Sequence, residues 1–394
     1  MLVTDLLFNQ ISAARVSAFN VLRAVSEGAY ASDELLLSTR AMESRDAGLA
    51  AQIVFGCLRF QAQLDHLVKI YSGRRPEQIE PPVLVALRMA IFQLRYLDRI
   101  PPHAAVNETV ELVKRHRKAA GAFANAVLRK VNRKPVRWPD LPTELSCPDW
   151  LLKRWVQHFG SERAAAIAKA ALEEPQRFVR VPPGSVLPGN AELEPTEVEG
   201  CFLLGSPLPT AMRLHDIGSQ AVLPLLDLRP GQSYLDVCAA PGNKTVQALE
   251  TPLGFALACD ISPQRASQIP PVCHRLVLDA TRPLPFARKF DRIFVDAPCS
   301  GTGTLARNPE IKWRVQEGDL FRFQEKQVQI VSEAIRHLAP GGRLLYATCS
   351  LEREENEAVI ERILRAYPQL RPADELWRLP GRDPGDGFYA ITLR

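Results

Sequence analysis

Two cysteines are the residues of this chain best suited to chemistry, because each follows a short apolar run. Cys299 lies in the segment DAPCSGTGT (296–304), and Cys349 lies in YATCS (346–350). A cysteine thiolate is a strong nucleophile, so either residue could carry covalent catalysis. A lone buried cysteine is usually inert. Two cysteines at neighbouring strand ends, one of them beside Asp296, favour a shared reactive site, and the residues alone leave the choice of nucleophile open.

The loop after an earlier apolar run, DVCAAPGNKT (236–245), has the composition of a ligand-binding turn. Small side chains let a ligand approach the backbone, Pro241 fixes one dihedral angle, and Gly242 tolerates a positive φ. The loop opens a predicted helix, whose N-terminus attracts anions, and Lys244 adds a positive charge. It lacks G-x-x-x-x-G-K, so it is no Walker A loop, and it lacks G-x-G-x-x-G, which disfavours a dinucleotide. The alternative is a tight strand-to-helix turn without a ligand.

Two further carboxylates close predicted strands. Asp260 follows Asp236 by 24 residues and ends the second strand, a position that suits a carboxylate accepting hydrogen bonds from ribose hydroxyls. Asp279 ends the third predicted strand, 276–279. For each of them the alternative is a helix N-cap, because Asp is favoured there.

Alternating elements position these residues. Short apolar runs at 234–238, 255–260, 276–279, 293–296 and 344–348 predict strands, and helices are predicted over 244–250, 320–338 and 354–367. This alternation predicts an α/β doubly wound sheet over residues 226–394. Ligands of such sheets bind at the carboxyl ends of the strands, where the polar residues named above stand.

The rest of the chain divides into two regions. Residues 1–138 have apolar residues at helical spacing and few strand signals, so an all-helical domain is predicted, with helices near 11–27, 82–97, 104–115 and 121–132. Residues 139–225 predict a mixed α+β connector, with helices over 149–158 and 162–172 and strand-like pieces at 178–181 and 201–204.

Composition excludes several classes of protein. The 394 residues are 46% hydrophobic and 24% charged, as in globular proteins, and no apolar run approaches the ~18 residues of a membrane span. The N-terminus, MLVTDLLFNQ, has no basic region, so we expect a cytoplasmic protein rather than a secreted one. The eight cysteines include no C-x-x-C pair, which argues against a disulfide framework and against a metal site. Nothing demands a dimer, so we expect a monomer.

Positive charge is concentrated near the end of the helical region. Residues 1–140 contain 20 Lys/Arg and 13 Asp/Glu, whereas the remaining residues contain 29 and 31. Between 111 and 137 there are nine basic residues and one acid, Glu111. Such a cluster predicts an RNA-phosphate surface, the alternative being a solvated helix face. The residues expected to bind RNA are Lys114, Arg115, Arg117, Lys118, Arg129, Lys130, Arg133 and Lys134.

Taken together, the motifs resemble those of the RNA cytosine-5 methyltransferase family. The matching pieces are CAAPGNKT (238–245), DAPCSGTGTLARNPEIKW (296–313), ATCSLEREENE (347–357), HDIGSQ (215–220) and DGFYA (386–390). The stretch 100–133 resembles the antitermination factor NusB, and a NusB-like domain before this catalytic domain is typical of the B type of bacterial small-subunit ribosomal RNA methyltransferases. The resemblance therefore implies a Rossmann-like methyltransferase domain preceded by an all-helical NusB-like domain and a small mixed connector.

The resemblance also implies the chemistry and its residues. The methyl donor would be S-adenosylmethionine, and the product 5-methylcytidine in small-subunit (16S) ribosomal RNA. Cys349 would be the nucleophile, Cys299 would assist product release, and Asp296 would reach the site floor and serve catalysis. The residues implied to bind the cofactor are Cys238, Ala239, Ala240, Pro241, Gly242, Asn243, Lys244, Asp260, Asp279 and Asp296.

Two departures from the family pattern and several alternatives accompany this interpretation. Asn243 replaces the second glycine of P-G-G-K, which we expect to be tolerated because Asn adopts left-handed backbone more readily than most residues. Prolines 263, 270 and 271 break the segment after Asp260, so its helix is expected to be short and the adenine pocket looser. Another RNA such as tRNA, DNA, or a non-catalytic RNA-binding role are the alternatives. DNA cytosine-5 methyltransferases use a Pro-Cys cysteine, a description that Cys299 fits.

Overall fold

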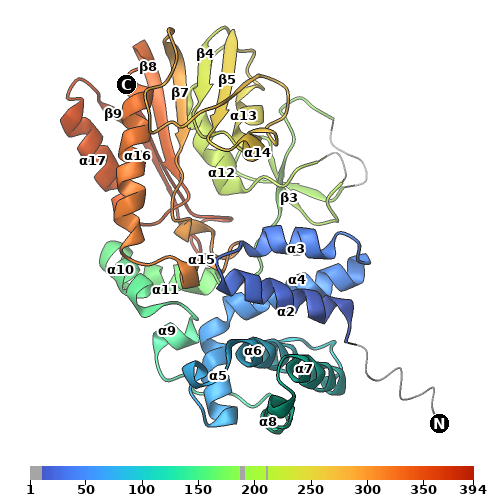
Figure 1. The fold of residues 1–394 in the computed structure, drawn as a ribbon. Helices are drawn as coiled ribbons and strands as arrows, with labels where there is room; N and C mark the ends of the chain where they lie inside the picture. Colours follow the sequence, from blue (N-terminus) through green and yellow to red (C-terminus); the bar gives the residue numbers. More distant parts are fainter. Residues whose placement is uncertain (1–10, 187–190, 210–211) are drawn as a thin grey trace. The chain divides into compact units, whose positions relative to one another are not determined.

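The computed structural model describes residues 11–186, 191–209 and 212–394, which form two compact units (Figure 1). The helical unit contains the residues up to Arg154 together with the segment Asn308–Arg314. The sheet unit contains Trp155–Arg307 and Val315–Arg394. The division into three regions at 138 and 225 stays a prediction.

The helical unit is built from helices in the order α2 (Ala13–Ser26), α3 (Ala31–Thr39), α4 (Ser44–Arg59), α5 (Gln61–Ser72), α6 (Pro81–Tyr96), α7 (Pro102–His116), α8 (Gly121–Leu128) and α9 (Leu141–Glu144), with α15 (Ile311–Arg314) added from later in the chain. Two prolines open α6, where the missing N–H costs nothing, and Gly73 ends α5 in left-handed conformation. The predicted helix over 121–132 ends earlier, at Leu128.

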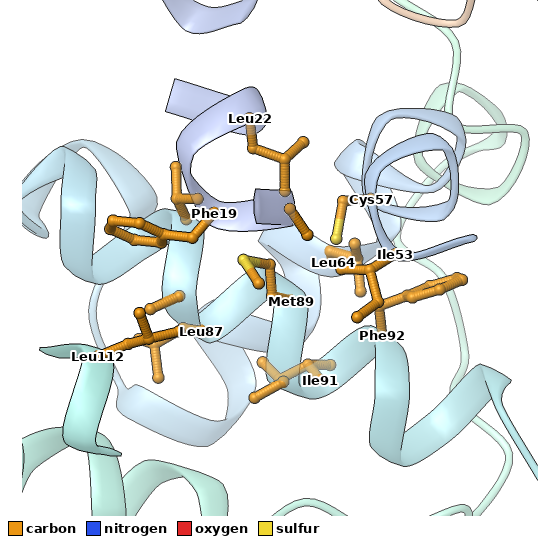
Figure 2. Packing of buried hydrophobic residues seen from close by; sticks show 14 of the residues in the cluster. Phe19, Leu22, Ile53, Cys57, Leu64, Leu87, Met89, Ile91, Phe92 and Leu112 are labelled. Atoms are coloured by element: carbon orange, nitrogen blue, oxygen red, sulfur yellow. The ribbon is translucent and has the colours of Figure 1, made fainter. Parts of the chain in front are cut away.

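Apolar side chains at helical spacing form one core in this unit. Figure 2 shows Phe19 and Leu22 of α2 beside Ile53 and Cys57 of α4 and Met89 of α6, all of them buried. The all-helical prediction for this region is confirmed.

The sheet unit begins with the end of α10 (Asp149–Phe159) and with α11 (Ser161–Ala170). A small antiparallel sheet of order β1-β3-β2 follows, made of β1 (Phe178–Arg180), β2 (Leu193–Pro195) and β3 (Cys201–Leu204). The main sheet contains β4 (Ser233–Asp236), β5 (Phe255–Asp260), β6 (His274–Val277), β7 (Phe290–Asp296), β8 (Leu338–Thr348), β9 (Pro372–Arg378) and β10 (Phe388–Leu393). Its helices are α12 (Ile217–Val222), α13 (Asn243–Ala248), α14 (Pro263–Ala266), α16 (Asp319–Ile335) and α17 (Glu357–Ala366).

The seven-stranded sheet has the order β6-β5-β4-β7-β8-β10-β9. The first five are parallel neighbours, and β10 and β9 add an antiparallel edge. Alternate strand residues face opposite layers, because side chains alternate along a strand. Leu235, Ile293 and Tyr346 pack with α16 and α17, whereas Tyr234 and Phe294 pack with α12 and α13 on the other face (Figure 1). Helices on both faces confirm the doubly wound prediction.

Two sequence predictions need correction in detail. The third strand spans His274–Val277 rather than 276–279, so Asp279 lies two residues beyond its end. The antiparallel hairpin of β9 and β10 was not predicted, because neither segment was identified as a strand from the sequence. The expected short helix after Asp260 is confirmed, since α14 has only four residues.

Among the described residues, no helix has both the length and the apolar composition needed to cross a membrane.

Candidate active site

The two cysteines singled out by the sequence lie together. Strands β7 and β8 are parallel neighbours, with Asp296 paired with Ala347 in register, so the loops that follow them start side by side. The Sγ atoms of Cys299 and Cys349 are 3.3 Å apart, and both residues are partly exposed. The structure therefore places both thiols and Asp296 at the carboxyl ends of the two central strands.

The protonation of Cys299 depends on its neighbour. A hydrogen bond with Cys349, together with burial and the charges of Cys349, Glu355 and Asp296, holds the pKa of Cys299 well above its usual range. The Cys299 thiol is therefore favoured over its thiolate while it is hydrogen-bonded to Cys349.

Lys244 and Asp296 form an ion pair beside the thiols. The Lys244 Nζ donates to Asp296 Oδ2 at 2.7 Å and lies 5.0 Å from the centre of the Phe388 ring. Burial lowers the pKa of Lys244, but the adjacent Asp296 carboxylate and the more distant charges of Cys349 and Asp236 outweigh it and raise the pKa overall. A positive charge is thus held next to Asp296.

The predicted ligand loop turns at Gly242. This residue has φ +97° and caps α13, and a β-carbon there would approach Pro270 Cδ to 2.9 Å. The Ala240–Pro241 peptide is cis. Asn243 begins α13 and donates through Nδ2 to the carbonyl of Leu214 at 3.0 Å. Its backbone is not left-handed, so the expected reason for tolerating Asn at this position is wrong.

Two Asp residues near the loop, Asp260 and Asp236, have different surroundings. Asp260 is buried, and its two oxygens accept from the backbone N–H groups of Ala240 at 3.3 Å and Ser262 at 3.0 Å. Ser262, not Asp260, caps α14, so the helix-cap alternative for Asp260 is wrong. Asp236 accepts from the Thr245 hydroxyl at 2.6 Å, and burial raises its pKa to about 7.

Asp279 closes a turn instead of a strand. It accepts from the backbone N–H of Thr281 at 3.0 Å and from its hydroxyl at 2.6 Å, and these bonds lower the pKa of Asp279. Arg282 lies 3.4 Å away. No contact in the structure assigns it a ligand, and its proximity to adenine stays a prediction.

Sequence reasoning missed a carboxylate that holds both thiol loops. Glu355 is fully buried, and its Oε1 accepts from the backbone N–H of Ser300 at 2.8 Å, while Ser350 donates to its Oε2 at 2.5 Å. Gln327 donates to the same carboxylate and to the carbonyl of Pro298, each at 3.0 Å. Ser300 and Ser350, which follow the two cysteines, therefore both bind the carboxylate of Glu355. The segment ATCSLEREENE contained Glu355, but its four glutamates, at 352, 354, 355 and 357, gave no local sign of which one holds the loops.

An arginine with two buried carboxylates was also missed. Arg307 donates to Asp216 and to Asp386, each at 3.0 Å. Burial and the neighbouring charge of Asp216 raise the pKa of Asp386 to about 7, although Arg307 opposes this. The two acids belong to the motifs HDIGSQ and DGFYA, for which the sequence offered no roles.

The cationic residues expected to bind RNA are all exposed, and they differ in their partners. Lys114 pairs with Glu111 at 2.7 Å, Arg117 with Glu80, and Arg133 with Asp98, while Lys130 donates to the carbonyl of Tyr71 at 3.2 Å. Within the described part of the chain, no ionic partner is found for Arg115, Lys118, Arg129 and Lys134.

Comparison with known proteins gives the family. The family model described as 16S rRNA methyltransferase RsmB/F matches residues 223–394, and the NusB family model matches residues 12–133. The probable ribosomal RNA small subunit methyltransferase B of Bacillus subtilis (strain 168) is 31% identical over 91% of this chain and 93% of that protein. The chain belongs to the ribosomal RNA small subunit methyltransferase B family.

A second methyltransferase B relative supports the family, and a solved structure supports the fold. The Klebsiella pneumoniae (strain 342) protein is 31% identical over 98% of both chains. The crystal structure of PH0851 shares the fold at a TM-score of 0.81 and 21% identity, covering 98% of this chain and 99% of that one. The chain is thus an S-adenosylmethionine-dependent RNA methyltransferase with a Rossmann-like domain and a NusB domain, as the sequence predicted.

Proposed function

We propose that this chain methylates C5 of a cytidine in small-subunit ribosomal RNA through a covalent bond between Cys349 and C6. The observation that carries the proposal is the pair of thiols 3.3 Å apart beside the Lys244–Asp296 ion pair. Methyltransferases that act on nitrogen or oxygen need no thiol, so a paired thiol site favours a carbon acceptor. The NusB domain and the small-subunit names of the relatives support ribosomal RNA as the substrate.

The residues of the sheet unit fit S-adenosylmethionine. Small residues from Ala239 to Gly242 leave the loop backbone accessible, and Asp260 ends the neighbouring strand, where its oxygens can accept further hydrogen bonds from ribose hydroxyls. Lys244, Asp296 and the rest of the segment 238–244 would complete the site, with Asp279 near the adenine. The bound cofactor supplies a methyl group on a positively charged sulfur.

The thiols and the Lys244–Asp296 ion pair have different proposed roles in the reaction at cytosine. The Cys349 thiolate forms a bond to C6, and the electron pair of the C5–C6 double bond becomes available at C5. Asp296, which accepts a hydrogen bond from the Lys244 ammonium, is proposed to face N3, where a proton passed from Lys244 through the carboxylate neutralises the charge on the ring and returns when Cys349 leaves. After C5 carries the methyl group, loss of its proton restores the double bond and expels Cys349 as thiolate.

Cys299 is the proposed base for that last proton. Its hydrogen bond with Cys349 is the main cause of its raised pKa. Once Cys349 is bonded to C6, this hydrogen bond is lost, and the partly exposed Cys299 thiol can release its proton to water and then accept the C5 proton as a thiolate. The order of events therefore follows from the coupling of the two thiols.

Labelled S-adenosylmethionine and unmodified small-subunit ribosomal RNA test the proposal. We expect label in 5-methylcytidine, abolished by Cys349→Ala, whereas Cys299→Ala leaves a protein–RNA adduct that survives denaturing electrophoresis. Cys273→Ala, at a half-buried cysteine outside the pair, is the matched control and stays active. Near-normal turnover by Cys349→Ala, or label in another nucleoside, would contradict the mechanism. Binding of S-adenosylmethionine without methyl transfer to this RNA would point to tRNA or another acceptor.

The exposed Lys and Arg side chains of the helical unit are proposed to bind RNA phosphates. Arg115, Lys118, Arg129 and Lys134 should contribute most, because their charges are not neutralised by a carboxylate in the structure. Reversing these four charges should weaken RNA binding and make the slope of log K against log salt concentration shallower by up to about 2.8, at about 0.7 per phosphate contact with a single strand. Reversal of Arg40 and Arg45, exposed on the same unit, is the control. Unchanged binding by the fourfold variant would remove this role. A ribosomal RNA substrate also supports the cytoplasm as the site of action.

A further inference from the structure

The segment Asn308–Arg314 belongs to the helical unit although the methyltransferase family model includes it. Lys312 Nζ donates to the carbonyl of Arg59 at 2.8 Å, and Trp313 Nε1 donates to the carbonyl of Leu58 at 2.7 Å. The Arg314 guanidinium lies 4.0 Å from the centre of the Tyr30 ring. These contacts anchor the segment on α4 and next to α3.

A cavity of about 430 Å³ lies beside this segment, within the helical unit. Its apolar wall includes Leu22 and Cys57, whose side chains Figure 2 shows in the core. Its polar and aromatic wall includes Glu310, Trp313 and Arg314. The volume falls within the roughly 300–1,000 Å³ of small-molecule sites, which also combine apolar walls with a few polar groups.

Glu310 has one oxygen without a partner. The residue is 2% exposed, and its Oε1 accepts from the backbone N–H of Ala31 at 3.1 Å. Its Oε2 is buried and has no hydrogen-bond partner among the described residues. A buried carboxylate oxygen in that state is costly, so a ligand that donates an N–H to it gains a strong interaction. The Arg314 guanidinium supplies donors on the same wall, one of which reaches the carbonyl of Gly28.

We propose that this cavity binds one unstacked guanine base of the RNA substrate. Guanine presents a carbonyl acceptor, O6, beside two kinds of N–H donor, at N1 and N2. Glu310 would accept from these donors, Arg314 would donate to O6, and Trp313 offers an aromatic surface on which the base can stack. Proteins read RNA sequence mainly through such splayed-out bases. The inference rests on the proposed function for its substrate, but it concerns a site separate from the thiol pair.

Calorimetric titration of the full-length protein with guanosine, inosine and adenosine monophosphates tests the proposal. The wild-type protein should bind the guanosine nucleotide, about tenfold more weakly the inosine nucleotide, which lacks the N2 amine, and more weakly still the adenosine nucleotide, which lacks O6. Glu310→Gln should weaken guanosine monophosphate binding at least tenfold and remove its advantage over the inosine nucleotide. Glu43→Gln, at an exposed position of the same unit, is the matched control.

Equal affinity for the three nucleotides, no binding of guanosine monophosphate, or an unchanged affinity of Glu310→Gln would overturn the proposal. The nucleotide series on the wild-type protein keeps the test valid even where Glu310→Gln fails to fold. In methyl transfer, Glu310→Gln should raise KM for RNA and leave kcat unchanged. If 5-methylcytidine is not formed at all, the calorimetric result still stands, so failure of this inference and failure of the proposed function are distinguishable.

Discussion

A fully buried lysine of the helical unit allows a quantitative test. Lys312 is 1% exposed, and its Nζ donates to the carbonyl of Arg59 at 2.8 Å. Burial lowers the pKa of Lys312 from 10.5 to about 7. In the unfolded chain the group returns to its ordinary pKa, so the unfolded state binds more protons than the folded state between pH 7 and 10.5. Stability must therefore rise with pH across this window.

The size of the effect follows from the two pKa values. The pKa of Lys312 is 10.5 in the unfolded state and about 7 in the folded state. By linkage, its burial lowers the free energy of unfolding by about 4 kcal/mol at pH 7.5 and by about 1.4 kcal/mol at pH 9.5. The wild-type protein should therefore gain about 2.5 kcal/mol relative to Lys312→Met over these two pH units. Methionine keeps the approximate volume but removes the hydrogen bond that Lys312 donates to the Arg59 carbonyl, at about 1–3 kcal/mol, so at pH 7.5 the variant should be more stable by roughly 1–3 kcal/mol.

Urea unfolding followed by far-ultraviolet circular dichroism measures the difference, with two transitions fitted because the chain has two units. Titration of other groups cancels in the comparison of wild type and variant. Lys118→Met, at an exposed lysine of the same unit, is the control and should follow the wild-type pH profile. Parallel profiles for wild type and Lys312→Met between pH 7.5 and 9.5 would refute the reasoning.

Two further predictions concern the sheet unit. A β-carbon at Gly303 would lie 2.4 Å from the carbonyl oxygen of Gly387 and 2.8 Å from that of Cys349, so Gly303→Ala should displace the Cys349 loop and lower kcat about 100-fold. Gly318→Ala, where the space is open, should keep full activity, and equal kcat for the two variants would argue against this packing. Arg307→Ala should cost about 3–5 kcal/mol in urea unfolding at pH 8, because it leaves two buried carboxylates unpaired. This loss of stability should be smaller at pH 5.5, below the pKa of about 7 of Asp386. It should also be smaller when Arg307→Ala is made in a protein that already carries Asp386→Asn. An identical loss with and without Asp386→Asn would contradict the pairing.

Local patterns in the sequence were sufficient for the elements that carry the thiols. Apolar runs that end in Asp296 and Thr348 predicted two strands, and the doubly wound alternation predicted that their carboxyl ends meet. The structure confirms this with the 3.3 Å distance between Cys299 and Cys349. Such predictions succeed because strand formation, side-chain alternation and the chemistry of a thiol depend on neighbours along the chain.

Contacts between distant segments could not be predicted in the same way. Arg307 meets Asp216 and Asp386, which are 91 and 79 residues away in the sequence. Glu355 carries no local sign of burial, yet it holds the residues that follow both cysteines. These groups matter because a buried charge must find a partner, and that partner is set by the packing of the whole unit.

The sequence by itself identified the two thiols, the helical character of the N-terminal region and the sheet at whose strand ends the thiols lie. Only the tertiary structure decided that Asn308–Arg314 joins the helical unit and that Glu310 borders a cavity there with one oxygen unpaired. The physical reason is that periodicity and side-chain chemistry are local properties of the chain. Burial and hydrogen-bond satisfaction belong to the folded whole, because each depends on every segment that shares the space.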